Sequence, residues 1–210
     1  MKTLNLSESI RLAEKYGIKF APHAIAKDEK GLAKACKRLG FPVALKVVSG
    51  TISHKTEAGG VVTGIRSNKE ALSAYRRLWK LKGFEGLLVQ KMVKGTEVII
   101  GGKRDVQFGP TLLVGLGGIF VEVFQDYSIG ICPISTSQTR KMLQELKSYP
   151  ILKGYRGRKG VNLHKLEEAI LKVSRMMIKE TTIQELDLNP IIANEKEVIA
   201  VDARVVVDGK

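Results

Sequence analysis

The chain has 210 residues, of which 44% are hydrophobic and 27% are charged. This composition is typical of a globular protein and excludes a disordered chain, and the length allows one sizeable domain or two small lobes. The formal net charge of +14 attracts polyanions in general, such as nucleotides, coenzyme A, nucleic acid or an acidic protein chain, but we interpret it mainly as a solvated basic surface, with a partner-docking face as the next alternative. The basic residues are spread along the chain without interleaved aromatic residues, which argues against a site for single-stranded nucleic acid.

Two isolated cysteines, Cys36 and Cys132, form no CxxC pair, so neither a zinc site nor a disulfide framework is expected. The most apolar stretch, 111–123, is too short and too rich in glycine to span a bilayer. Because no signal peptide is seen either, we expect a cytoplasmic protein without membrane contact.

Helices and strands alternate in the first part of the chain. A helix is expected to begin at an N-cap residue, Ser7, and to end before Gly17. A second helix over 28–39 repeats its apolar residues with a helical period and ends before Gly40. The other elements predicted here are strands over 18–25, 41–48, 61–65 and 86–90, and a helix over 69–80.

Strands dominate the second part of the chain. They are predicted over 97–101, 111–114, 120–124 and 128–131, and are followed by helices over 137–145 and 163–179 and a closing strand pair over 185–192 and 198–207. This order predicts an α/β (α+β) fold in two lobes. Lobe one covers about residues 15–90, and lobe two covers about residues 91–210, with residues 1–14 as an N-terminal helix. We expect a ligand cleft between the lobes.

Lys46 interrupts an otherwise apolar strand. Its ammonium could reach a phosphate while its alkyl stem packs against neighbouring side chains. The alternative is an edge lysine that reaches solvent.

The segment 49–60, which follows this strand, is rich in small and hydroxylated residues. Its backbone N–H groups could close on an anion, and the Gly59-Gly60 pair would allow close approach. It matches neither a Walker A loop nor the GxGxxG fingerprint. His54 in this loop could carry a transferable group, because neutral imidazole is nucleophilic near neutral pH. A hydrogen-bonded turn histidine is the alternative.

A nucleotide hinge is predicted at the end of the strand over 86–90. The backbone around Gln90 and Lys91 could pair with the edge of an adenine, Met92 and Val93 could pack on the base, and Glu97 could accept hydrogen bonds from ribose hydroxyls. An ordinary strand end with a surface glutamate is the alternative.

A magnesium site is predicted on the closing strand pair. Asp187 and Asn189 are two residues apart on one strand and therefore project from the same face. Asp202 would reach that face if the last two strands form a hairpin around residues 194–197. Oxygen ligands gathered in this way suit Mg²⁺, whereas solvent-facing polar residues are the alternative.

Six motifs in order resemble, over essentially the whole chain, the ATP-grasp chain of the ADP-forming acyl-CoA synthetases. The similarity is greatest to the small β subunits of archaeal ADP-forming acetyl-CoA synthetases, and the β subunit of succinyl-CoA synthetase is a more distant relative. The motifs occupy residues 41–47, 53–61, 103–110, 115–123, 154–157 and 185–190.

The resemblance implies an ATP-grasp fold that binds ATP or ADP with Mg²⁺. It places the nucleotide at Lys46, Ser53, Gly59, Gly60, Gln90, Lys91, Val93 and Glu97, and the magnesium at Asp187, Asn189 and Asp202. His54 matches the histidine that relays a phosphoryl group to a phosphohistidine on a separate α subunit, which also binds CoA. The implied reaction is acyl-CoA + ADP + phosphate ⇌ carboxylic acid + ATP + CoA. Arg104 is our own candidate for holding the travelling phosphoryl group, through its fork of donors.

The sequence departs from the family pattern at two places. Gly50-Thr51 stands where relatives commonly have a proline and an acidic residue, and Gly130 stands where many carry arginine. Two other functions stay open: another ATP-grasp carboxylate ligase, which would not need His54, and a basic nucleic-acid-binding protein.

Overall fold

The computed structural model describes residues 1–209 except 50–57, 119, 120 and 122. Its internal contacts divide the chain into two compact units. Unit 1 contains residues 1–4, 9–20 and 94–210, and unit 2 contains residues 5–8 and 21–93. Among the described residues, no helix is long and apolar enough to cross a membrane.

Unit 2 is built on a four-stranded antiparallel sheet with the strand order β2-β5-β3-β4. Two helices supply the rest of its core. The elements are β2 (His23–Ala26), α2 (Glu29–Leu39), β3 (Val43–Val48), β4 (Val61–Ile65), α3 (Asn68–Leu78) and β5 (Gly86–Lys91).

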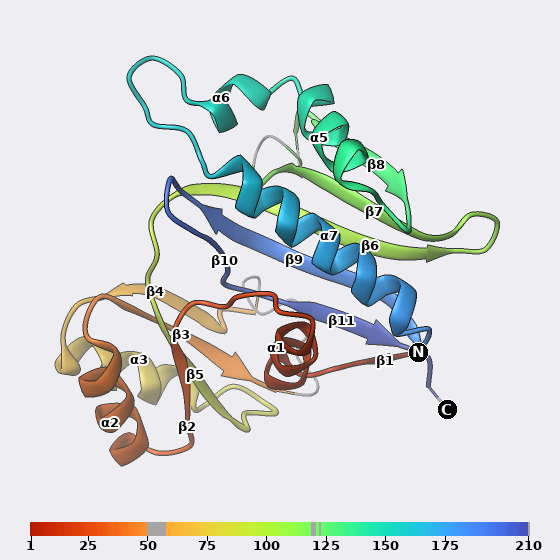
Figure 1. The fold of residues 1–210 in the computed structure, drawn as a ribbon. Coiled ribbons are helices and arrows are strands. Elements are labelled where there is room, and N and C mark those ends of the chain that lie inside the picture. The colour runs from red at the N-terminus through yellow and green to blue at the C-terminus, as the bar shows by residue number, and fades with distance from the viewer. Residues whose placement is uncertain (50–57, 119–120, 122, 210) are drawn as a thin grey trace. The chain divides into compact units, whose positions relative to one another are not determined.

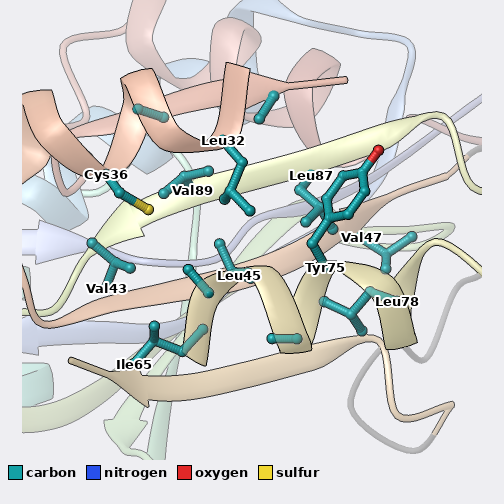
Figure 2. Packing of buried hydrophobic residues seen from close by; sticks show 14 residues of the cluster. Leu32, Cys36, Val43, Leu45, Val47, Ile65, Tyr75, Leu78, Leu87 and Val89 are labelled. Atoms are coloured by element: carbon teal, nitrogen blue, oxygen red, sulfur yellow. The ribbon is translucent and has the colours of Figure 1, made fainter. Parts of the chain in front are cut away.

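The two faces of this sheet carry different side chains. One face carries alternate residues such as Val43, Leu45 and Val47, which pack with α2 and α3 side chains including Leu32 and Leu78 (Figure 2). The other face carries Ala44, Lys46, Leu88 and Gln90, which are buried as well. A lysine and a glutamine thus occupy a face on which every other central position is apolar.

Side-chain caps fix the helix starts near those predicted. Asp28 accepts a hydrogen bond from the Gly31 N–H at the start of α2, and Ser67 does the same for Glu70 at the start of α3. The prediction of Ser7 as the first N-cap is wrong. Helix α1 (Leu6–Lys15) is instead capped by Asn5, whose backbone N–H and side chain exchange hydrogen bonds with Glu8.

Unit 1 is built on a sheet with the order β1-β11-β9-β6-β7-β8, to which β10 adds by pairing with β9. All of these strand pairs are antiparallel. The strands are β1 (Lys2–Thr3), β6 (Thr96–Asp105), β7 (Gly109–Leu116), β8 (Tyr127–Ile131), β9 (Ile183–Ala193), β10 (Val198–Ala200) and β11 (Arg204–Val207). The helices that follow β8 are α5 (Thr136–Glu145), α6 (Tyr149–Lys153) and α7 (Leu163–Lys179).

Helices α5 and α7 cover one face of the unit 1 sheet (Figure 1). Glycines let them approach closely: a Cβ on Gly102 would lie 2.8 Å from the Met177 Sδ, and one on Gly130 would lie 2.9 Å from the Met142 Sδ. The departure from the family arginine at position 130 therefore coincides with a close approach of α5 to β8. Leu186 and Leu188 of β9 are buried, so Asp187 between them projects from the opposite face.

Three predictions for the elements are wrong. The strand over 18–25 is shorter and later, at β2, because Phe20 makes only an isolated bridge to Ala200. The described residues of 120–124 contain no strand, and the Val121 N–H donates to the Gly118 carbonyl in a turn. The strand over 198–207 is broken into β10 and β11.

Candidate functional site

Lys46 and Gln90 lie near each other on one face of the unit 2 sheet. Lys46 on β3 pairs with Leu88 on β5, and Ala44 pairs with Gln90, so Lys46 and Gln90 are diagonal neighbours. The lysine is 6% exposed and the glutamine is 2% exposed. A buried ammonium and a buried amide on one sheet face could meet the phosphate and the base of one nucleotide.

The Gln90 amide is a donor in need of an acceptor. Its Nε2 is buried and makes no hydrogen bond to any described residue. Leaving such a group unpaired costs about 1–3 kcal/mol. A ring nitrogen or carbonyl of a bound base would satisfy it, so this orphaned donor fits a nucleotide.

The hinge after β5 is held by its own hydrogen bonds. The Lys91 N–H donates to the Pro22 carbonyl and the Met92 N–H donates to the Pro42 carbonyl, at 2.8 and 3.1 Å. The Lys91 Nζ donates to the carbonyls of Gly40 and Phe41. Lys91 therefore anchors the hinge with its side chain and its N–H. Among the described residues, the Val93 N–H has no backbone partner and is the hinge donor open to a ligand.

His54 and Ser53 lie outside the described residues. The ends of their segment are nevertheless fixed: it leaves β3 after Val48 and returns at Gly60, whose carbonyl accepts the Val47 N–H at 2.9 Å. Gly59 has a φ of +67° and no heavy atom within 4 Å of a Cβ built on it. The predicted loop thus begins and ends next to Lys46, with open space at Gly59.

In unit 1, Glu97 lies beside a pair of glycines. Its carbonyl accepts the Gly117 N–H at 2.8 Å, and a Cβ on Gly117 would lie 3.1 Å from the Glu97 Cβ. A Cβ on Gly118, whose φ is +62°, would lie 3.8 Å from the Glu97 Oε2. The side chain of Glu97 is exposed, so these glycines leave its carboxylate accessible to a ligand.

The predicted magnesium ligands gather around Asp187. This residue lies on β9 between Gly101 of β6 and Arg204 of β11. Burial raises the pKa of Asp187; the Arg204 charge lowers it, and the charges of Asp202 and Glu185 raise it further, so that it lies above its ordinary value. Asp202 therefore lies close enough to repel Asp187.

Asp202 reaches this place differently from the prediction. It lies in the break between β10 and β11, and its Oδ1 accepts the N–H of Ala203 at 2.9 Å. Asn189 is exposed two residues beyond Asp187. Within the described chain, no three His, Cys, Asp or Glu residues are placed to hold a metal ion. The candidate set of two carboxylates and one amide suits a hard cation that keeps water ligands, and such a cation would relieve the repulsion at Asp187.

The hydrogen bonds of Arg104 disfavour the prediction that it holds a phosphoryl group. Its Nε donates to the Ile183 carbonyl at 3.0 Å, and its Nη2 donates to the carbonyls of Met177 and Glu180 at 2.8 and 3.3 Å. The fork of donors is thus used at the carboxyl end of α7. There a cation satisfies carbonyls that have no partner within the helix.

Arg204 is a site residue that the sequence analysis missed. Its Nη1 donates to the Glu185 Oε2 at 3.3 Å, and its charge acts on Asp187. A signal was present, because Arg204 is a single basic residue in an apolar strand, two positions after the predicted ligand Asp202.

Comparison with known proteins decides the family. Residues 1–207 match the ATP-grasp domain. The chain belongs to the ATP-grasp family. This match confirms the ATP-grasp fold that the motifs predict. The similarities given next confirm the resemblance to the ADP-forming acetyl-CoA synthetases.

The ATP-grasp chain is 39% identical over 207 residues to the "Acetate--CoA ligase [ADP-forming] I subunit beta" of Pyrococcus furiosus, and covers 89% of that subunit. It is 38% identical to the "Acetate--CoA ligase [ADP-forming] I" of Archaeoglobus fulgidus, of which it spans only 30%. A solved structure from Ca. Korarchaeum cryptofilum superposes with a TM-score of 0.94 at 38% identity, covering 99% of this chain and 94% of that one. That protein is a dinucleotide forming acetyl-coenzyme A synthetase 1 in complex with coenzyme A, Ca-AMPCP and HgCl⁺.

Proposed function

We propose that this protein is the nucleotide-binding β subunit of an ADP-forming acyl-CoA synthetase and that it needs a separate α chain for the complete reaction. The observation that carries the proposal is its similarity, over 95% of its length, to a subunit that it covers almost completely, beside single-chain ligases of which it spans 30%. The reaction is acyl-CoA + ADP + phosphate ⇌ carboxylic acid + ATP + CoA. The α chain would bind CoA and carry the phosphohistidine, and both chains would work in the cytoplasm.

The residues that we propose for the nucleotide lie in unit 2, except Glu97, which lies in unit 1. Lys46 would neutralise phosphate oxygens, and the Gln90 amide and the Val93 N–H would meet the base. Glu97 would accept from the ribose, and the backbone near Ser53, Gly59 and Gly60 would close on the phosphates. The orphaned donor on Gln90 supports this arrangement. The predicted cleft between the lobes stays a prediction.

Magnesium would be held by Asp187, Asn189 and Asp202. When bound, the ion would neutralise charge on the phosphate oxygens. A relative with 36% identity was solved with coenzyme A and Mg-AMPPCP, its phosphohistidine segment pointing towards the nucleotide binding site. The neighbouring Arg204 donates its hydrogen bond to Glu185, and it acts on Asp187 only through its charge.

His54 would divide the transfer of the phosphoryl group into two steps. A neutral ring nitrogen would attack the terminal phosphorus of ATP, a P–N bond would form, and the P–O bond to ADP would break. The partner's histidine would then take the phosphoryl group and return His54 to its neutral form. Lys46 would hold the phosphate oxygens during the first step, since the loop that carries His54 begins and ends beside it.

The test follows ³²P from γ-labelled ATP in a mixture of this protein with the candidate α chain from the same genome. We expect label on both chains for the natural sequence, and label on neither for the variant His54→Asn. Full transfer and full activity with His54→Asn would contradict the relay and favour another ATP-grasp ligase. The melting temperature at saturating Mg-ADP is a control for folding, because a bound ligand stabilises the native state.

A further inference from the structure

Unit 1 contains a pocket of about 480 Å³ that the nucleotide chemistry does not use. Its walls are mostly apolar and come from Phe124, which precedes β8, from Pro150 and Ile151 of α6, and from Tyr155 in the loop after α6. Figure 1 shows α6 and this loop beyond one end of α7, next to α5. A volume of this size can hold a large apolar side chain with room to spare.

The buried polar groups of the pocket bind one another. Asp126 is 6% exposed, and its two carboxylate oxygens accept the N–H groups of Lys147 and Ser148, each at 2.8 Å. Burial would raise the pKa of Asp126, but hydrogen bonds from the Ser148 side chain and from the two backbone N–H groups lower it. The buried polar groups therefore satisfy one another, and the apolar walls are left for an apolar side chain.

Backbone strain is concentrated on this pocket. Among the described residues, the non-glycine residues with positive φ are Gln125, at +50°, and Arg156, at +49°. Each is adjacent to an aromatic residue of the pocket, Phe124 or Tyr155. Strained backbone of this kind persists where the surroundings enforce it, and it clusters at binding sites.

The loop that presents Tyr155 is closed tightly on itself. The Val161 N–H donates to the Leu152 carbonyl at 2.8 Å, which joins the two ends of the loop. A Cβ on Gly154 would lie 2.8 Å from the Arg158 carbonyl oxygen, and one on Gly160 would collide with Lys153. The loop therefore holds its conformation before a ligand arrives, which lowers the entropy cost of binding.

Positive charge surrounds the apolar walls. The segment 147–159 contains five basic residues and no acidic residue, and all five are exposed: Lys147, Lys153, Arg156, Arg158 and Lys159. The Arg156 guanidinium lies 5.7 Å from the centroid of the Tyr155 ring, and Lys159 pairs with Glu195 at 3.0 Å. The charge of Lys147 acts on the Asp126 carboxylate, and the other three cations have no acidic partner among the described residues. This surface complements a segment that carries acidic side chains.

We propose that the pocket receives an aromatic or branched apolar side chain from an acidic segment of the partner α chain. The proposal rests on the proposed function, because it needs a separate α chain. Exposed aromatics and arginines around a preformed pocket are typical of the residues that dominate protein–protein affinity. The charged rim would speed association and select an acidic partner.

The test measures binding of the candidate α chain by isothermal titration calorimetry to the natural sequence and to four variants. Phe124→Ala and Tyr155→Ala remove the aromatic walls, and we expect each to raise the Kd by roughly 10- to 30-fold. Arg156→Glu combined with Arg158→Glu should weaken binding most at low salt and should lower its salt dependence. The matched control is Phe108→Ala, because Phe108 and Phe124 are both 61% exposed but Phe108 does not line the pocket.

Binding of Mg-ADP by each variant separates this proposal from the proposed function. The docking site would be supported if the pocket variants, but not the control, bind the α chain more weakly while their affinity for Mg-ADP is unchanged. Equal α-chain affinity for all variants would overturn the docking site and leave the nucleotide function intact. No α-chain binding by the natural sequence would overturn it too. Two other results, each with α-chain binding unchanged, would assign the pocket to another occupant. If only the pocket variants lose self-association, the occupant is a second copy of this chain. If only they lose oligonucleotide binding, the occupant is nucleic acid.

Discussion

Arg204 lies directly opposite Asp187 on the neighbouring strand, but its Nη1 donates to Glu185. Its Nε is buried without a hydrogen-bond partner among the described residues. The positive charge of the guanidinium thus acts on Asp187 without donating a hydrogen bond that would stabilise the ionised carboxylate. The repulsion from Asp202 and Glu185 and the cost of burial together exceed that field, so the pKa of Asp187 is raised.

Asp187→Asn should therefore stabilise the protein in the absence of magnesium and nucleotide. Because the folded-state pKa is raised, the folded protein binds this proton more tightly than the unfolded chain does, and the ionised carboxylate lowers the free energy of unfolding. This penalty is largest at pH values above the raised pKa. It decreases as pH falls through the raised pKa towards the ordinary value of 3.8.

Thermal unfolding of both proteins across this pH range, with EDTA present, measures the effect. We expect a higher melting temperature for Asp187→Asn at neutral pH, a difference that vanishes in acid, and a weaker stabilisation by Mg-ADP. A variant that is less stable at neutral pH would show that the carboxylate is already satisfied by the protein.

Lys46→Met should weaken Mg-ADP binding by about 10- to 100-fold, since a hydrogen bond to a charged group contributes about 1.5–3 kcal/mol. Methionine keeps most of the volume and tolerates the buried position, so the fold should survive. Lys91→Met is the contrast on the adjacent strand. It removes the hydrogen bonds to Gly40 and Phe41 and should lower stability, while the hinge backbone is left unchanged. Titration calorimetry and denaturant unfolding separate the two effects, and equal losses of affinity would argue against the role of Lys46.

Arg104→Met should lower the free energy of unfolding by about 2 kcal/mol, because three carbonyls near the end of α7 lose their donor. Nucleotide affinity should stay within about twofold of the natural protein. Arg175→Met, an exposed arginine on the same helix, controls for loss of charge. Urea unfolding gives the first quantity. A selective loss of phosphoryl transfer at normal stability would restore Arg104 to the active site.

Gln90→Leu should raise stability and weaken nucleotide binding together. Leucine fills a similar volume and removes a buried amide nitrogen that makes no hydrogen bond, which should add about 1 kcal/mol to the free energy of unfolding. The lost donor should cost about tenfold in Mg-ADP affinity. Unfolding and calorimetry on the same sample give both values, and a destabilised variant would show that the amide is satisfied without a ligand.

Local chemistry made much of the fold predictable from the sequence. Helix α7 was predicted with its observed bounds, because its apolar period is clear and strands or loops bound it on both sides. The helix predicted over 28–39 includes Asp28, which caps α2 from the residue before it, because a helical period does not separate a cap from the first turn. The prediction of Ser7 as a cap was wrong because the reciprocal hydrogen bonds between Asn5 and Glu8 decide the start of α1.

The site was less predictable, because its residues depend on contacts between distant strands. The orphaned Gln90 amide, the pairing of Arg204 with Glu185 and the use of Arg104 at α7 all join segments that are far apart in sequence. Arg104 shows that a motif can identify a residue without giving its contacts. Its donors point to three carbonyls, which no rule of sequence spacing predicts. The break that contains Asp202 was missed because both halves are equally apolar.

The short strand β1 pairs with β11, so that Lys2 lies opposite Val207 and Thr3 opposite Val206. During synthesis, every strand of the unit 2 sheet has left the ribosome once residue 91 has emerged, whereas the sheet of unit 1 can close only after residue 207. Strand β1 must therefore wait for β11. In a growing chain, residues 21–93 would fold ahead of the segments on either side of them, and β1 would stay unpaired and available to chaperones until residue 207 has emerged.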